Sequence, residues 1–184
     1  MKKFIATALA VSALLLGGVA AAAPAQASPA VSKAADVGVN PLGACSAGYY
    51  YRSTGRGADT FGAVGTQQSD YNGTATPAIV TFTSKTSGTV SATYSGSTNV
   101  ALSVEIASIS STYGISASVS KTVTLGNSIQ FTVPAHKTGN GTYGAYKAYV
   151  TGVEEWWTNT CVVTSSYSKT IYSPYKVGWN IWIS

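Results

Sequence analysis

The sequence predicts an all-β protein, folded as an antiparallel sandwich or a long twisted sheet. Apolar residues alternate with Ser, Thr and other small residues through residues 98–134, and a period of two is typical of half-buried strands. Charged residues make up 9% of the chain while Gly, Ser, Thr and Tyr are abundant, a composition typical of an exported all-β domain. After residue 27 no helix of useful length is indicated, so short strands with regular turns define the expected architecture.

The central stretch is expected to form three consecutive strands, because each part keeps its apolar residues on one parity. These parts are Val100–Ile106, Ile115–Leu125 and Ile129–Val133. Gly126 and Asn127 separate the last two, and Gly in the first turn position favours a tight type II′ hairpin. Further short strands are predicted at Tyr49–Tyr51, Ala78–Thr83, Thr89–Tyr94, Thr142–Val150, Cys161–Ser165, Lys169–Tyr172 and Trp179–Ile183, with a polar loop at Ala135–Gly141.

Residues 1–27 have the pattern of a secretory signal peptide. Lys2 and Lys3 precede an apolar run, and Ala25-Gln26-Ala27 forms a small-x-small cleavage site. A membrane anchor is the alternative, which the Ala- and Gly-rich second half of the run and the cleavage site disfavour. We therefore expect a secreted, extracellular chain with a flexible N-terminal arm at 28–44 and one β-sandwich-like domain at 45–184.

The two cysteines, Cys45 and Cys161, are expected to form a disulfide. Export places them in an oxidising compartment, and neither has a second Cys or a His near it in the sequence, as a metal site or a reactive thiol would require. Such a bridge closes a loop of more than 100 residues, which the chain-entropy model values at roughly 4–5 kcal/mol.

No residue pattern indicates catalysis, a metal or a cofactor. His136 is the single histidine and no nucleophile elbow accompanies it. Glu154 and Glu155 are neighbours on an expected strand, so their carboxylates should point to opposite faces and not act as a pair. The chain is expected not to be an enzyme and to use no cofactor.

The charge indicates no nucleic-acid partner. Removing Lys2 and Lys3 from the 11 basic residues leaves nine against six acidic residues, a net charge of +3. The remaining basic residues are scattered, whereas nucleic-acid binders concentrate them in a patch.

Two groups of residues are candidate binding sites. The arm could dock extended into another secreted protein, with Val37, Val39 and Leu42 as apolar anchors. Four tryptophans could stack on a glycan or face a partner, although packing against the sheet is the more common role of such residues: Trp156, Trp157, Trp179 and Trp182. Trp179 and Trp182 have opposite strand parity, so at least one of them should be exposed or lie at an interface.

The Ser/Thr-rich alternating strands that end in Phe131–Ala135 (FTVPA) resemble the sheet region of aerolysin-type β-pore-forming toxins. The resemblance implies an amphipathic hairpin that refolds into a membrane barrel. Lys121 departs from that pattern, because it lies on the apolar parity of its strand and would cost roughly 2–4 kcal/mol per copy near the bilayer midplane.

The mature chain as a whole is similar to the adaptor subunit of umbrella toxin particles, which are secreted antibacterial assemblies. The similarity rests on size, export, fold class and the N-terminal arm. It implies a non-enzymatic adaptor that docks through residues 28–44. We therefore expect an interaction module of a toxin-related assembly, with a β-pore-forming or membrane-active toxin and a carbohydrate-binding module as alternatives.

Overall fold

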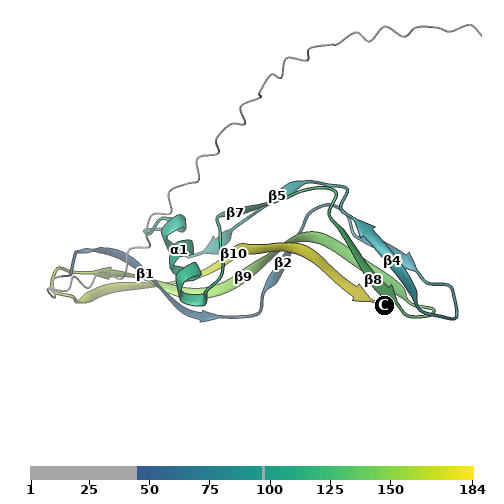
Figure 1. Ribbon diagram of the computed structural model, residues 1–184. Helices are drawn as coiled ribbons and strands as arrows, with labels where there is room; N and C mark the ends of the chain where they lie inside the picture. The colour runs from purple at the N-terminus through teal and green to yellow at the C-terminus, as the bar shows by residue number, and fades with distance from the viewer. Residues whose placement is uncertain (1–44, 97) are drawn as a thin grey trace, which may run out of the picture. The chain divides into compact units, whose positions relative to one another are not determined.

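The computed structural model describes residues 45–96 and 98–184, and the protein is mostly β, with antiparallel sheets throughout. This confirms the predicted fold class. The sheets are joined by turns and by one helix within the described residues, α1 (Leu102–Tyr113). The chain's ten described strands and α1 are labelled, where there is room, in Figure 1.

Two long neighbouring strands form the centre of the largest sheet. β9 (Thr138–Trp157) and β10 (Val163–Ile183) pair antiparallel from Gly139 to Trp157. The other edge of β9 is occupied in turn by three short strands, and β6 pairs with the middle of β10 (Figure 1). The short strands on β9 are β1 (Gly48–Arg56), β2 (Thr60–Ala63) and β3 (Gln68–Tyr71), and β6 is Thr93–Ser95.

Two further strand pairs pack against this sheet. β4 (Ala78–Thr83) pairs with β8 (Ser128–Val133), and β5 (Gly88–Ser91) pairs with β7 (Ser120–Val123). Phe82 and Val133 of the first pair form an apolar cluster that Trp179 of β10 also contacts. Gly139 and Gly141 make room for this packing, since a Cβ on either would lie within 3 Å of an apolar side chain of the pair.

The predicted strand Val100–Ile106 is wrong, and so is the expectation that no helix follows the leader. The apolar residues of this segment fit both the period of a strand and the period of a helix. Alternation gives one set of apolar residues, but Leu102, Ile106, Ile109 and Tyr113 also recur at helical spacing. In the structure the helical spacing prevails, because Ile109 of α1 packs into the apolar cluster formed with β1, β9 and β10. Val104, which belongs only to the alternating set, is 42% exposed.

The predicted hairpin around Gly126 and Asn127 is also wrong. The two strands that flank the turn do not pair with each other: β7 pairs with β5, and β8 pairs with β4. The turn is bonded to Ser84 instead, with Gly126 N–H donating to its carbonyl and Ser84 N–H donating to the carbonyl of Asn127. Gly126 has a φ of 85°, which a residue without a Cβ adopts readily.

The predicted loop at Ala135–Gly141 is shorter, because β9 already begins at Thr138. The three short strands predicted after Cys161 are one strand, β10, of 21 residues. Pro174 interrupted the pattern in the sequence, yet β10 continues through it with a register shift between Pro174 and Lys176. An irregularity of this kind lets a strand accommodate a residue that has no N–H to donate.

The predicted disulfide is confirmed. Cys45 and Cys161 are bonded, with their Cα atoms 5.3 Å apart, and they are 116 positions apart in the sequence. Cys161 lies in the turn between β9 and β10, and Cys45 lies three residues before β1. The bridge therefore ties the beginning of β1 to the β9–β10 turn.

Candidate functional site

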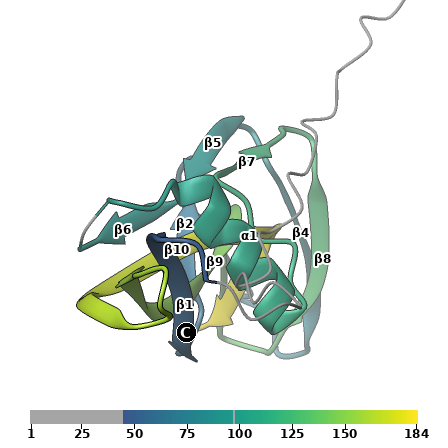
Figure 2. The same cartoon turned by 90° about the vertical axis from the view of Figure 1, so that its left-hand side faces the viewer.

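Three charged side chains meet in the interior beneath α1. Lys169 Nζ lies 2.7 Å from Glu105 Oε1 and 2.8 Å from Glu154 Oε1. The Lys169 side chain is 1% exposed and both glutamate side chains are fully buried. We call these three residues the ion cluster; it joins α1, β9 and β10. Figure 2 shows α1 in front of the strands to which the other two residues belong.

Glu154 is also bonded to the chain that leads into α1. Its Oε2 accepts hydrogen bonds from the backbone N–H and the side-chain amide of Asn99, and Oε1 accepts a long one from Val100 N–H. The carboxylate on β9 thus fixes the segment just before α1, while Lys169 fixes α1 itself. Glu154 lies on β9 and Lys169 lies on β10, and these two strands pair with each other.

Burial and neighbouring charges shift the pKa values of the cluster. The pKa of Glu105 is raised to about 7, because desolvation and the nearby Glu154 carboxylate together outweigh the opposing effect of Lys169. Burial lowers the pKa of Lys169, but the hydrogen bonds and charges of both glutamates outweigh burial and leave it raised. Lys169 therefore stays charged at neutral pH, whereas Glu105 titrates near neutral pH.

Aromatic groups surround the cluster. The ring of Tyr94 on β6 lies with its centre 4.8 Å from Lys169 Nζ. A cation over an aromatic ring is held by the negative face of the ring. Tyr51 of β1 is buried, and desolvation together with Glu105, Tyr113 and Glu154 raises its pKa to about 12. Tyr51 is therefore neutral near pH 7.

The helix above the cluster has few features that favour a helix. Its N-cap, Ala101, provides no side-chain hydrogen bond, and no basic residue lies in its last turn. Its sequence LSVEIASISSTY is rich in Ser and β-branched residues, which have low helix propensity. Only its C-terminus is well formed, where Gly114 at φ 62° donates its N–H to the carbonyl of Ser110. Tertiary contacts therefore hold α1 in place.

The ion cluster is closed to solvent, so it cannot receive a substrate. Within residues 45–96 and 98–184, no group of three or more His, Cys, Asp or Glu residues could hold a metal ion. The same residues contain no helix that is long and apolar enough to cross a lipid bilayer. The ion cluster connects α1, which has low intrinsic helix propensity, to the central sheet.

The four predicted tryptophans do not meet. Trp156 and Trp157 lie at the end of β9 next to β1, where Trp156 packs edge-on against Tyr49 and Trp157 donates its indole N–H to Glu155. Trp179 and Trp182 lie opposite Tyr143 and Asn140, toward the other end of β9. Trp182 is 38% exposed, as the strand parity predicts for one of this pair.

Glu154 and Glu155 are separated as predicted. Glu154 belongs to the buried ion cluster, whereas Glu155 accepts a hydrogen bond of 2.7 Å from Arg52 of β1. Lys121 lies on β7, half-buried and paired with Val90. The predicted arm anchors Val37, Val39 and Leu42 lie outside the described residues.

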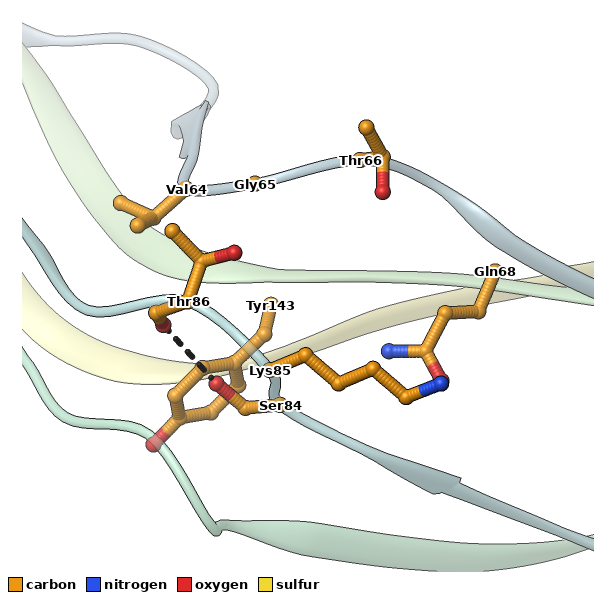
Figure 3. A pocket seen from close by; sticks show the side chains of 8 residues that line it. All are labelled: Val64, Gly65, Thr66, Gln68, Ser84, Lys85, Thr86 and Tyr143. Carbon is orange, nitrogen blue, oxygen red and sulfur yellow. Dashed lines mark hydrogen bonds between the residues drawn. The ribbon is translucent and has the colours of Figure 1, made fainter.

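A small polar pocket lies between the β2–β3 and β4–β5 connections (Figure 3). It has a volume of about 110 Å³, and eight residues line it: Val64, Gly65, Thr66, Gln68, Ser84, Lys85, Thr86 and Tyr143. Its polar groups are partly used within the protein, since Ser84 donates to the carbonyl of Thr86 and Gln68 donates to that of Thr83. The pocket therefore offers few free groups for a ligand.

The sequence analysis did not identify Glu105 or Lys169 as partners. Each stands alone in a Ser/Thr-rich stretch, and the assignment of Glu105 to a strand hid its place on a helix. One signal was present: a charged residue inside an apolar pattern is rarely buried unless it is paired. The partner itself is set by tertiary structure.

Comparison with known proteins places the chain in no family. No protein-family model and no curated protein matches it. Among solved structures it is similar to the crystal structure of the parasporin-2 Bacillus thuringiensis toxin that recognizes cancer cells, at 14% sequence identity and a TM-score of 0.30. That similarity covers 77% of this chain and 72% of the other.

Proposed function

We propose that this protein is a secreted, non-enzymatic β-protein that acts on lipid membranes by converting the segment 100–123, which contains α1 and β7, into an amphipathic β-hairpin. The observation that carries the proposal is the double pattern of the first half of this segment. Residues 100–113 have the alternation of a strand, yet Leu102–Tyr113 fold as a helix with weak intrinsic helix propensity. Two packings of one sequence can differ by only a few kcal/mol, which allows a segment to switch.

The alternation continues consistently across a hairpin. If Ser111 and Thr112 form a two-residue turn, Ile106 faces Ala117, Val104 faces Val119 and Leu102 faces Lys121. Residues on the opposite face are then mostly small or polar, and Glu105 lies among them: Ser103, Glu105, Ala107, Ile109, Ser116, Ser118 and Ser120. One face would suit lipid and the other an aqueous lumen.

Lys121 sets the length of the part that could be embedded. The strands between it and the turn, residues 102–110 and 113–121, have nine residues each, and a tilted membrane strand needs about 9–11. In this arrangement Lys121 stands at the membrane interface, where a lysine costs about 0–1 kcal/mol rather than the 2–4 kcal/mol of the midplane. Lys121 therefore limits the length of hairpin that can be embedded in the membrane, but it does not prevent insertion.

The decisive experiment compares two lysine substitutions at neighbouring positions. Ser103 and Val104 are both exposed on α1, so Ser103→Lys and Val104→Lys should leave the folded protein equally stable. In the hairpin Val104 faces lipid and Ser103 faces the lumen. Dye release from phosphatidylcholine–phosphatidylglycerol vesicles should therefore be lost with Val104→Lys and kept with Ser103→Lys. Absence of release by the unaltered protein, or equal release by both variants, contradicts the proposal.

A second candidate function is an interaction module of an extracellular, toxin-related assembly. Three neighbouring apolar residues at the end of β10 support it, because Ile181, Trp182 and Ile183 are 38–42% exposed. Exposed aromatic and aliphatic residues are common at protein interfaces. Affinity capture of secreted proteins by the full-length chain, by a chain without residues 28–44 and by Trp182→Ser distinguishes the arm from this surface. Capture that is unchanged in both variants contradicts the candidate.

A further inference from the structure

The helix α1 of the segment 100–123 is held by the ion cluster, whereas the end of the segment is held by the pairing of β7 with β5. Glu105 is the charged residue of the segment that is fully buried, and its contact with Lys169 is 2.7 Å long. Hydrogen bonds flank α1 on both sides: Asn99 donates its backbone N–H and its side-chain amide to Glu154, and Ser118 donates its backbone N–H and its hydroxyl to the carbonyl of Pro174. Opening α1 would have to break the Glu105–Lys169 contact first.

We propose that the contact between Glu105 and Lys169 is a lock that keeps α1 closed over the central sheet, and that uptake of a proton by Glu105 stabilises this closed form. The inference rests on the proposed function for its purpose, since a lock matters only if the segment can open. Its physical content concerns the folded protein alone and can be tested without a membrane.

The charges in the cluster explain the direction of the effect. With both glutamates ionised, two negative charges face one buried ammonium group, so the three side chains of the ion cluster together carry a net charge of −1. With Glu105 protonated, Lys169 and Glu154 form a neutral pair. Oε2 of Glu105 accepts no hydrogen bond from the described residues, and a proton on this oxygen could be donated toward Glu154.

Other ionisable groups face the cluster from every element packed against it. They are Tyr113 of α1, Tyr51 of β1 and Tyr94 of β6, and burial raises the pKa of Tyr51 to about 12. Glu154 of β9 and Lys169 of β10 complete the set. The histidine of the chain, His136, precedes β9 and so lies near the end of that strand remote from Glu154. A transition between pH 5 and pH 8 in α1 that is lost in Glu105→Gln would therefore report on Glu105.

The sign follows from linkage. Glu105 has a pKa of about 7 when α1 is closed and near 4.5 when it is exposed, so the closed form binds the proton more tightly. The contribution of this group is fully present below pH 4.5 and is lost as the pH rises toward 7. Between pH 5 and pH 8, the equilibrium constant for opening α1 should increase on the order of 70-fold.

Hydrogen–deuterium exchange of the α1 amides, corrected for the intrinsic rate, measures this equilibrium constant in the full-length protein. The unaltered protein should show the increase between pH 5 and pH 8. Glu105→Gln keeps an acceptor for Lys169 and cannot ionise, so its opening constant should change less than threefold. His136→Gln, the matched control, should behave as the unaltered protein does.

A second variant changes the other partner of the contact, so that the test does not depend on Glu105→Gln alone. Lys169→Met removes the cation and should speed α1 exchange most at pH 8, with partial recovery at pH 5, where Glu105 is protonated. Exchange in α1 that is independent of pH in the unaltered protein overturns the lock. Opening constants that are equal in α1 and β9 at every pH also overturn it, because α1 would then open only when the whole protein unfolds. A working lock without dye release from vesicles would overturn the proposed function instead.

Discussion

Glu105 and Lys169 are 64 positions apart in the sequence, yet their charged atoms lie 2.7 Å apart in the interior of the protein. This contact joins the helix α1 to the strand β10, and Glu154 extends it to β9. A buried cation with two carboxylates is stable only while each member has its partners.

Replacing Lys169 by methionine should destabilise the protein strongly. Two buried carboxylates would lose their cation, and removal of one member of a buried ion pair costs about 3–5 kcal/mol. Urea unfolding monitored by tryptophan fluorescence measures the change. Lys176→Met is the control: Lys176 is exposed, with Nζ 4.5 Å from the ring centre of Tyr146, and should cost no more than about 1 kcal/mol. Equal losses in the two variants would show that burial of the cluster contributes nothing.

The free energy of unfolding should fall as the pH rises from 4.5 to 7. The pKa of Glu105 is raised to about 7 in the folded protein, so its stabilising contribution is present below 4.5 and lost by about pH 7. The loss should be on the order of 3 kcal/mol. Glu105→Gln should flatten the profile in this window.

The contribution of Asp59 to the free energy of unfolding should have the opposite pH dependence to that of Glu105, and in a more acidic range. Burial alone would raise its pKa, but the hydrogen bonds from Tyr175 and Arg56 overcome this effect and lower it. Its stabilising contribution is therefore present above pH 4 and is lost in more acidic solution. Asp59→Asn should change the stability profile below pH 4 and leave the range from 4.5 to 7 unchanged. A change of slope above pH 4.5 in this variant would contradict the assignment of that slope to Glu105.

Removal of the disulfide should lower stability by roughly 4–5 kcal/mol. The bridge joins residues 116 positions apart, and the loss of loop entropy in the unfolded chain grows with the length of the closed loop. The double variant Cys45→Ala, Cys161→Ala tests this by chemical unfolding, with the reduced unaltered protein as a second form of the same state. A loss below 1 kcal/mol in both would show that the unfolded chain is already compact.

Gly144 should tolerate no side chain. A Cβ at this position would lie 2.1 Å from the carbonyl oxygen of Gly62 on the neighbouring strand β2, so Gly144→Ala must push β2 away from β9. Its cost should exceed the 1–3 kcal/mol that is usual for overpacking. Gly178→Ala is the matched control, because the nearest atom to its Cβ would be 3.7 Å away. Similar melting temperatures for the two variants would contradict the close approach of β2 and β9.

The sequence predicted the fold class because a period of two is a local signal, and it predicted the disulfide because isolated cysteines have few other roles in a chain that is expected to be exported. It failed at α1 for a physical reason. Residues 100–113 satisfy both the period of a strand and that of a helix, and only the apolar cluster around Ile109 decides between them. Similarly, the turn at Gly126 was recognised, but its strands pair with partners elsewhere in the chain, which local patterns do not encode.

The ion cluster was beyond sequence analysis because its three residues come from three elements. The strand parity of Glu154 and Glu155 was informative and correctly separated them onto different partners. No local rule could pair Glu154 with Lys169 across the β9–β10 turn and with Glu105 above the sheet.

The pairing of β9 with β10 has a consequence for the order of folding. The two strands are consecutive and are joined by a short turn in which the backbone N–H of Thr158 donates a hydrogen bond to the carbonyl of Val162. The pairing of β9 with β10 can therefore start at the turn and extend along both strands, because it closes only a short loop and costs little entropy. It should proceed on the timescale of hairpin formation. β1, β2 and β3 must find β9 over separations of up to 109 residues, as between Gly48 and Trp157, and should join later. Pulsed hydrogen exchange during refolding should accordingly show protection in β9 and β10 before β1 and α1.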